Sequence, residues 1–302
     1  MKVLITGATG FVGSNLARAL VNIPDMKVSI TVRHDTDFWR IGDIRSAFVQ
    51  TYAVDLSDRD AVDNLVQRVE PDVVYHAASY GGFSSQNDPE QMIRTNLSAL
   101  IHLIDASAAN GVKHFINTGS SSEYGMKNSP MKEEDSCFPL SLYGITKLAA
   151  TQYCSNVGIA QAALPTNPTS SASGMKVCTL RLFSPYGPNE DPSRLYPSII
   201  SALSRDQRPK LSRPDSVRDF IPIETVVQIY LQILQTDYPS GAVINVGSGK
   251  QQTIARFYNQ IALQLGKADI EPIWGETPPR ANEPLMWEAD TTKLKSLFPW
   301  MK

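Results

Sequence analysis

The glycine spacing near the start of the chain restricts the fold more than any other feature. Gly7, Gly10 and Gly13 stand between an apolar run at residues 2–6 and an amphipathic stretch. A strand, a glycine-rich turn and a helix N-terminus form a dinucleotide-binding unit, because glycines allow a tight turn and let the backbone approach a pyrophosphate closely. An ordinary strand-to-helix turn is the alternative. The strand directly before and the helix directly after favour a cofactor site.

The rest of the first half continues this alternation. Short runs rich in β-branched residues alternate with stretches that carry apolar residues at helical spacing, which is typical of βαβ units and a parallel sheet covered on both faces. We predict strands over residues 2–6, 28–32, 51–54, 73–76, 114–118 and 176–182. We predict helices over residues 13–22, 59–69, 89–110 and 142–157. The predicted fold class is α/β, with a doubly wound parallel Rossmann sheet.

The pattern changes beyond Gly187. Pro, Arg and Asp become frequent, strands shorten, and helices are predicted over residues 196–204, 223–235 and 254–265. We expect residues 1–186 to form the dinucleotide-binding domain and residues 187–302 a smaller C-terminal α/β substrate lobe, with part of 215–250 returning to the Rossmann domain. Residues 161–174 are rich in Pro, Ser and Thr, which predicts a surface loop.

Composition and charge exclude several functions. The chain of 302 residues is 42% hydrophobic and 19% charged, which is typical of a folded protein. Its net charge is −2 and no basic run interleaves with aromatic residues, so nucleic-acid binding is not expected. We find neither a signal peptide nor a membrane-length apolar stretch, and therefore expect a cytoplasmic protein without a membrane partner. The three cysteines and four histidines lack metal-ligand spacing, which predicts free thiols and no metal site.

Residues after the third and fourth predicted strands extend the cofactor site. Asp55 and Leu56 follow the third strand, where a carboxylate can meet an adenine amino group. Ala77, Ala78 and Ser79 follow the fourth, where small side chains leave room for a cofactor. Each alone could be a loop cap or a packing position. Their joint placement at the carboxyl ends of strands, where open α/β sheets bind ligands, favours cofactor contacts.

The end of the second predicted strand bears on the choice of cofactor. Arg33 offers a planar cation for a 2′-phosphate or for stacking on adenine. We therefore favour NADP(H) over NAD(H). In the alternative, Arg33 is a solvated charge and Asp35 bonds the ribose.

A tyrosine and a lysine on a predicted helix are the main catalytic candidates. Tyr143 and Lys147 are four residues apart, which places both on one helix face. A chance surface pair has the same spacing. Here the pair follows the serine-rich segment TGSSSEYG at residues 118–125, which itself follows an apolar strand.

In this order the motifs resemble the extended short-chain dehydrogenase/reductase family, in its NAD(P)-dependent epimerase/dehydratase group, over nearly the whole chain. The matching pieces are TGATGFVG at 6–13, VDL around 55, HAAS at 76–79, TN at 95–96, GSSSEYG at 119–125, YGITK at 143–147, LRLFSPYGP at 180–188 and VRDFI at 217–221. The resemblance implies a nucleotide-sugar substrate, with 4-keto reductases and 4-epimerases as the most similar enzymes.

The resemblance also implies residue roles. Ser120 hydrogen-bonds the reacting oxygen, Tyr143 transfers a proton, and Lys147 lowers the pKa of Tyr143 and holds the nicotinamide ribose. The cofactor set predicted in this way is Gly7, Gly10, Phe11, Val12, Gly13, Arg33, Asp55, Leu56, Ala77, Ala78, Ser79, Asn96, Tyr143 and Lys147.

Departures from the family patterns narrow the reaction. Ser121 and Ser122 replace the Asp and Glu of 4,6-dehydratases, which disfavours dehydration. Ser122 and Asn189 stand where GDP-fucose synthase carries its epimerisation cysteine and histidine. We predict NADP(H)-dependent reduction of an NDP-4-keto-6-deoxy sugar, with a 4-epimerase holding NAD tightly as the alternative. A dinucleotide-sensing regulatory protein is a non-enzymatic alternative, which the intact catalytic set disfavours.

Arginines are the main candidates for binding the substrate diphosphate, because guanidinium groups match it bidentately. Arg218 and Arg280 occupy places where the family uses arginine, although any single one could be a plain surface charge. Glycine before Phe83 would let a hexose approach that ring. The predicted substrate set is Gly82, Phe83, Ser121, Ser122, Ser184, Arg194, Arg213, Arg218 and Arg280. Ser184 replaces the asparagine that is usual in the family.

The helices at 89–110 and 142–157 are the predicted homodimer interface. Beside the face with the catalytic pair, the second helix carries small or apolar residues at Leu148, Ala149, Thr151, Gln152 and Cys154. A helix that is apolar beyond its core stripe usually has a second partner, and in the family this is the same helix pair of another subunit. The alternative is that these residues lie beneath the loop at 161–174.

Overall fold

A seven-stranded parallel sheet forms the centre of the computed structural model, which describes residues 1–163, 174–276 and 284–301. The strands follow the order β11-β6-β5-β4-β1-β2-β3. Their bounds are β1 Lys2–Thr6, β2 Lys27–Val32, β3 Gln50–Ala53, β4 Val73–His76, β5 His114–Ser120, β6 Lys176–Leu182 and β11 Ala242–Val246. All six predicted strands are present, whereas β11 was not predicted. The strand order reverses at β1, because β2 and β3 lie on one side of it and β4, β5, β6 and β11 on the other, so the turn after β1 lies at the switch point of the sheet.

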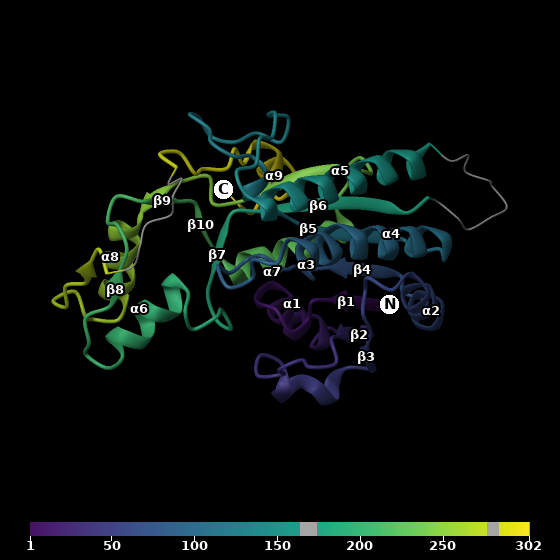
Figure 1. Ribbon diagram of the computed structural model, residues 1–302, viewed down its shortest axis with the longest axis horizontal. Helices are drawn as coiled ribbons and strands as arrows, with labels where there is room; N and C mark the ends of the chain where they lie inside the picture. The colour runs from purple at the N-terminus through teal and green to yellow at the C-terminus, as the bar shows by residue number, and fades with distance from the viewer. Residues whose placement is uncertain (164–173, 277–283, 302) are drawn as a thin grey trace.

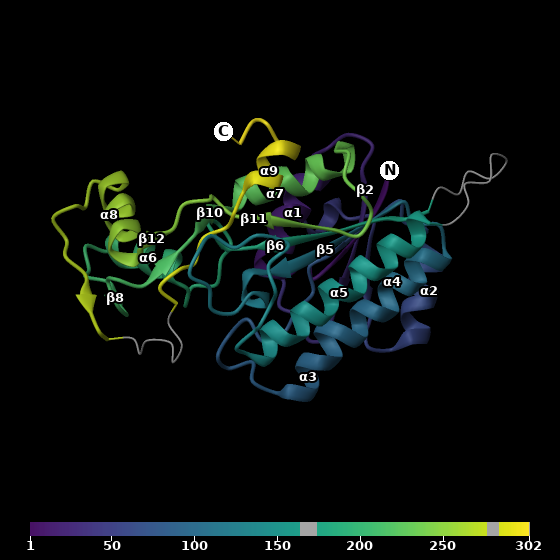
Figure 2. The ribbon, with the colours of Figure 1, turned by 90° about the horizontal axis from the view of Figure 1, so that it is seen from above.

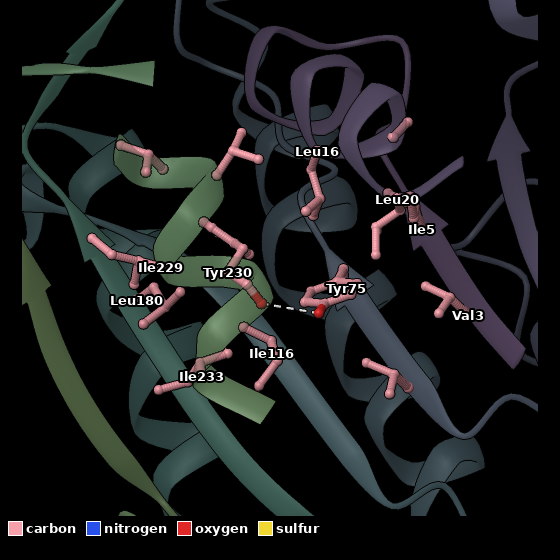
Figure 3. Packing of buried hydrophobic residues seen from close by; sticks show 14 of the residues in the cluster. Val3, Ile5, Leu16, Leu20, Tyr75, Ile116, Leu180, Ile229, Tyr230 and Ile233 are labelled. Carbon is pink, nitrogen blue, oxygen red and sulfur yellow. Dashed lines mark hydrogen bonds between the residues drawn. The ribbon is translucent and has the colours of Figure 1, made fainter. Parts of the chain in front are cut away.

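Helices cover both faces of the sheet (Figure 2). On one face lie α2 (Arg59–Val69), α4 (Ala99–Ala109) and α5 (Leu142–Ala162), and on the other lie α1 (Phe11–Val21), α7 (Ile223–Gln232) and α9 (Thr292–Leu297). Side chains of a strand alternate between these layers: Val3 and Ile5 join the cluster under α1 and α7, whereas Leu4 joins the cluster under α2 and α4. Figure 3 shows the first cluster, in which the Tyr75 hydroxyl donates to the backbone carbonyl of Tyr230 at 2.9 Å.

The predicted single helix at 89–110 is interrupted. It consists of α3 (Pro89–Ile93), a π-helical turn η2 (Arg94–Ser98) and α4. The start is well specified, because the Asp88 side chain accepts from two backbone N–H groups of the first turn and Pro89 occupies its first position. At the wide turn, the Asn96 side chain bonds the Tyr80 backbone and the Thr146 hydroxyl. These lateral bonds accompany a π turn of the kind often found near functional sites.

Helix α5 carries the catalytic candidates and is longer than predicted. Its cap is Ser141, whose hydroxyl accepts from the Gly144 N–H at 3.1 Å. Thr151 and Cys154, which we expected on its outward side, are buried, so that expectation was wrong. The outward side instead carries Ile145 and Ile159, which are 51% and 63% exposed.

A smaller lobe lies at one end of the sheet (Figure 1). It contains α6 (Leu195–Leu203), α8 (Ile254–Gln264) and the short strand pairs β8 (Lys210–Leu211) with β13 (Ile273–Trp274) and β9 (Val217–Arg218) with β12 (Gln252–Thr253). Its own apolar cluster includes Ile199, Leu203, Phe257 and Ile261. The pair β7 (Ser184–Tyr186) and β10 (Phe220–Pro222) connects it to the sheet. The short turns η1 (Gly42–Ala47), η3 (Ser121–Glu123) and η4 (Ile233–Gln235) complete the elements of the described ranges.

The chain crosses between the central sheet with its helices and the smaller lobe more than once. α7 packs on α1, and β11 pairs with β6. Leu294 and Phe298 also belong to the cluster under α1 and α7, although we expected the C-terminal segment in the smaller lobe. The buried Asp219 carboxylate helps to hold these crossings, since it accepts from the backbone N–H groups of Ser248, Gly249 and Ala289. Among the helices of the described ranges, none is long and apolar enough to cross a membrane.

Candidate active site

A cleft of about 1180 Å³ runs from the carboxyl ends of the sheet strands to the smaller lobe. One end is formed by the turn after β1 and the ends of β2, β3 and β4, and the other by residues of β7, α6, β8 and β9. The ends of β5 and α5 lie between them. The cleft therefore joins the predicted cofactor residues to the predicted substrate residues.

The glycine turn fits a dinucleotide. Gly7 has a φ of 70°, and a Cβ there would lie 2.5 Å from the backbone of Ala77 and Ala78, so only glycine lets this turn meet the end of β4. The predicted cofactor residues that line this end are Gly7, Gly10, Phe11, Val12, Arg33, Asp55, Leu56, Ala77, Ala78 and Ser79. Gly13 and Asn96 do not line the cleft: α1 passes the Gly7 carbonyl at Gly13, and Asn96 holds the Tyr80 backbone.

Two arginines stand at the end of the cleft formed by β2. Arg33 is exposed and lines the cleft, whereas Asp35 does not line it. Arg40, which was not among the predicted residues, also lines the cleft, and its guanidinium donates to the carbonyls of Thr9 and Asn189. Burial lowers the pKa of Arg40. The only sequence signal for Arg40 is its place in the loop after Arg33.

The catalytic candidates come together from β5 and α5. The Tyr143 hydroxyl is hydrogen-bonded to the Ser120 side chain, and both residues line the cleft. Lys147 lies one turn further along α5, where its Nζ donates to the Thr118 carbonyl. Its side chain is only 3% exposed and is not part of the lining. Tyr143 and Ser120 therefore line the cleft, whereas Lys147 does not.

The pKa of Tyr143 differs from our expectation. We predicted that Lys147 lowers it, but burial raises the pKa of Tyr143 above its ordinary value, and the nearby Glu123 charge acts in the same direction. The bond from Ser120 and the Arg194 charge oppose this rise without cancelling it. Burial also lowers the pKa of Lys147. Tyr143 therefore holds its proton more firmly than an unperturbed phenol, which is itself neutral at pH 7.

A buried ion pair lies beneath the serine segment. Glu123 and Arg181 have side-chain exposures of 0% and 3%, and the Arg181 Nη2 lies 2.9 Å from the Glu123 Oε2. Arg181 Nε donates to the same oxygen at 2.9 Å, and the other carboxylate oxygen accepts from the Ser120 backbone N–H at 2.7 Å. The pair thus fixes the backbone of Ser120. Both residues lie within motifs of the sequence, but neither was predicted to have a role.

Arginines and aromatic rings surround the substrate end. Arg194 donates to the Gly82 carbonyl, and its guanidinium lies 4.3 Å from the centre of the Phe83 ring. The predicted substrate residues that line the cleft are Gly82, Phe83, Ser121, Ser122, Ser184, Arg194 and Arg218. Arg213 does not line it and forms a surface ion pair with Asp215 at 2.6 Å. Arg280 lies outside the described residues.

Several lining residues were missed at this end. The rings of Tyr186, Phe220 and Phe257 form a contiguous wall, with Phe220 and Phe257 stacked at 3.9 Å between ring centres. Glu190 also lines the cleft, and burial raises its pKa to about 7. The aromatic residues are spread over 72 positions of the sequence from Tyr186 to Phe257, so no local motif marks the wall.

Comparisons with known proteins agree with this arrangement. Residues 3–247 match the NAD dependent epimerase/dehydratase family. The "Uncharacterized UDP-glucose epimerase YtcB" of Bacillus subtilis (strain 168) is 26% identical over 308 residues, which cover 99% of this chain and 92% of that protein. The GDP-6-deoxy-D-mannose reductase of Pseudomonas aeruginosa is 24% identical over 310 residues, covering 99% and 91%. The crystal structure of UDP-glucuronic acid 4-epimerase from Bacillus cereus, in complex with UDP-glucuronic acid and NAD, has a TM-score of 0.81 and 26% identity and covers 99% of this chain and 93% of that chain.

Proposed function

Because the chain belongs to the NAD dependent epimerase/dehydratase family, which makes it an enzyme acting on nucleotide sugars, we propose that it reduces the 4-keto group of an NDP-4-keto-6-deoxy sugar with NADP(H). The observation that carries the proposal is the placement of Ser120 and Tyr143 on the cleft between the predicted cofactor residues and the predicted substrate residues. Burial and the Glu123 charge both raise the pKa of Tyr143, so its phenol keeps the proton that an unperturbed phenol also carries at neutral pH. Reduction of a ketone requires a proton donor at the new hydroxyl, and a neutral phenol supplies one.

The chain's own residues divide the work along the cleft. Ser120 and Tyr143 hold the ketone oxygen, and Tyr143 gives that oxygen its proton. A nicotinamide dinucleotide, when bound against the glycine turn, supplies the hydride chemistry. In this proposal Arg194 and Arg218, which line the cleft, bind the diphosphate of the substrate, and the aromatic wall excludes water from the sugar.

The choice of NADP(H) rests on the two arginines. Arg33 lines the cleft and Asp35 does not, which favours a cation for a 2′-phosphate over a carboxylate for a ribose. Arg40 adds a second cation beside the glycine turn, through its bond to the Thr9 carbonyl. A cytoplasmic location belongs to the same proposal, since the cysteines at 137, 154 and 178 are unpaired and free thiols persist in reducing compartments.

A 4-epimerase with tightly bound NAD is the second candidate. It is favoured by the structural similarity to a 4-epimerase that was crystallised with NAD. An epimerase returns its cofactor to the starting state, whereas a reductase consumes one equivalent for each product molecule. Purified protein should be treated with acid and the released dinucleotide identified, followed by assays of NADPH consumption with 4-keto-6-deoxy sugar nucleotides. Stoichiometric NADPH oxidation would support the reductase. Co-purified NAD together with conversion of an NDP-hexose in the absence of added cofactor would overturn it in favour of the epimerase.

A further inference from the structure

An asparagine of α1 attaches the segment between β7 and α6, residues 188–191, to the glycine turn. The Nδ2 of the half-buried Asn15 donates to the Pro188 carbonyl at 2.9 Å and to the Phe11 carbonyl at 2.9 Å. Its Oδ1 accepts from the Asn189 Nδ2 at 3.1 Å. One side chain therefore joins the first turn of α1 to the segment that follows β7.

Arg40 makes a second attachment between the same two parts. Its Nη1 donates to the Thr9 carbonyl at 3.1 Å, and its Nε donates to the Asn189 carbonyl at 2.8 Å. Its Nη2 lies 3.8 Å from the Asp191 carboxylate, and the side chain is only 12% exposed. A planar guanidinium can bond two elements at once, whereas the ammonium of a lysine is a compact point charge. Two sets of hydrogen bonds thus hold the glycine turn and the segment together.

The segment continues from this attachment directly to the substrate end. Asn189 has a φ of 66°, in the left-handed region that asparagine adopts more readily than most residues. Two residues later, the Asp191 carbonyl accepts from the N–H of Arg194, which is the N-cap of α6, at 2.9 Å. The Arg194 guanidinium in turn donates to the Gly82 carbonyl and lies 4.3 Å from the centre of the Phe83 ring. The position of Arg194 therefore depends on a segment that is fixed at the glycine turn.

The two asparagines of this attachment lie outside the cleft. The lining contains Arg40, Asp191 and Arg194, so these three side chains can touch a ligand themselves. Within the described ranges, it contains neither Asn15 nor Asn189. The two asparagines therefore act on a ligand only through the segment that they hold. The sequence marked Asn189 only as the replacement of a histidine in GDP-fucose synthase, and its contact with Asn15 gives the side chain a purpose.

We propose that Asn15 and Asn189 are positioning residues: they tie residues 188–191 to the glycine turn and so hold Arg194 in place for the nucleotide sugar. This inference rests on the proposed function, because it requires a dinucleotide at the turn and a nucleotide sugar against Arg194. A segment that is fixed in advance loses less conformational freedom when its ligand binds. Affinity for the nucleotide sugar therefore depends on an asparagine that stands at the dinucleotide end.

The test measures the affinities of the two ligands separately by calorimetry. UDP-, GDP- and dTDP-glucose are first compared on wild type with saturating NADP⁺, and the one that binds most tightly is the probe. Asn15→Ala and Asn189→Gly release the tie from its two sides, and glycine keeps the positive φ at residue 189. In each variant we expect the Kd of the probe to rise roughly three- to tenfold, the effect of one or two lost hydrogen bonds. The Kd of NADP⁺ should stay within about twofold of its wild-type value.

The double variant adds a further requirement. Asn15→Ala and Asn189→Gly remove the same contact, so together they should raise the Kd of the probe by less than the product of their single effects. Independent effects, whose product equals the change in the double variant, would contradict a shared tie.

Asn22→Ala is the matched control. Asn22 is the C-cap of α1, and its Nδ2 also donates to a backbone carbonyl, that of Arg18 at 2.7 Å, within the same helix. Its removal should leave both Kd values unchanged. If Asn15 only stabilised the start of α1, its variant would weaken NADP⁺ at least as much as the probe. That result, or an unchanged Kd of the probe in both Asn15→Ala and Asn189→Gly, would overturn the positioning role. Failure of NADP⁺, or of all three glucose nucleotides, to bind wild type would overturn the proposed function itself, and this inference with it.

Discussion

Replacement of Glu123 by glutamine should destabilise the protein strongly. The amide keeps an oxygen for the Ser120 N–H and nearly the same shape, but it removes the charge that faces Arg181. The guanidinium is 3% exposed, lies 4.4 Å from the centre of the Tyr124 ring, and already has one nitrogen, Nη1, without a partner among the described residues. Breaking a buried ion pair on one side costs about 3–5 kcal/mol, because the remaining charge stays buried and unpaired.

The measurement is the free energy of unfolding from urea titrations followed by circular dichroism at neutral pH. A loss of this size is a large part of the roughly 5–15 kcal/mol by which a typical protein is stabilised. The variant stays folded if the free energy of unfolding of the wild type exceeds the loss, which holds over most of that range. The single variant Arg181→Met and the double variant Glu123→Gln with Arg181→Met complete a mutant cycle. The loss of stability in the double variant should be smaller than the sum of the two single losses by about 2 kcal/mol or more. A loss below about 1 kcal/mol for Glu123→Gln, or additive losses in the cycle, would refute the reasoning.

The same variant has a second readout in catalysis. The Glu123 charge raises the pKa of Tyr143, so its removal should lower that pKa. In the pH profile of kcat/KM, the alkaline limit that reports loss of the Tyr143 proton should move to lower pH. A purely structural role would reduce the amount of folded enzyme without moving this limit.

Three further predictions concern the cofactor, the phenol and the assembly. Tyr143→Phe should abolish turnover while NADPH affinity stays within a few-fold, because the hydroxyl acts on the substrate; near-normal rates would remove it from catalysis. Arg33→Ala should weaken NADPH binding by the roughly 1.5–3 kcal/mol of a charged hydrogen bond and leave NADH nearly unchanged, with Asp35→Ala as the matched control; equal losses for both cofactors would indicate adenine stacking. We propose a homodimer through α4 and α5, so analytical ultracentrifugation should give twice the monomer mass, which Ala149→Arg should halve. A wild-type monomer at micromolar concentration would contradict it.

The central sheet could be predicted because its signals are local. Buried parallel strands appear as short apolar runs, and the turn at Gly7 requires glycine whatever the rest of the chain does. The strand β11 (Ala242–Val246) was missed because it lies beyond Gly187, where the regular alternation of strands and helices ends, and it returns to the sheet only by pairing with β6. The spacing of apolar residues likewise did not predict the π-helical turn η2, because the hydrogen bonds of the Asn96 side chain join it to Tyr80 and Thr146, which lie outside this helix.

The cofactor end of the site was predicted from the sequence better than the substrate end, again because its signals are local. Eleven of the predicted cofactor residues line the cleft, and all of these except Tyr143 belong to the glycine turn or follow the ends of neighbouring strands, positions that are fixed by topology. At the substrate end the prediction relied on charge type alone. Arg213 and Glu190 are both ionisable residues of this segment, yet Arg213 pairs with Asp215 on the surface and Glu190 lines the cleft. Only the packing of the smaller lobe against the sheet decides between such positions.

The protonation of Tyr143 is the clearest case in which packing overrides a motif. The spacing of Tyr143 and Lys147 predicted a lowered pKa, but the balance is set by burial and by Glu123, which is itself held by Arg181 from the next strand. Three segments that are distant in sequence therefore determine whether the phenol gives or takes a proton. A reductase needs only the giving step, whereas a 4-epimerase needs both steps in each cycle, first removing a proton from a hydroxyl. A buried negative charge beneath the phenol makes it a weaker acid, but it also lowers the population of the phenolate base that only the epimerase needs, and this second effect is the physical reason for proposing reduction.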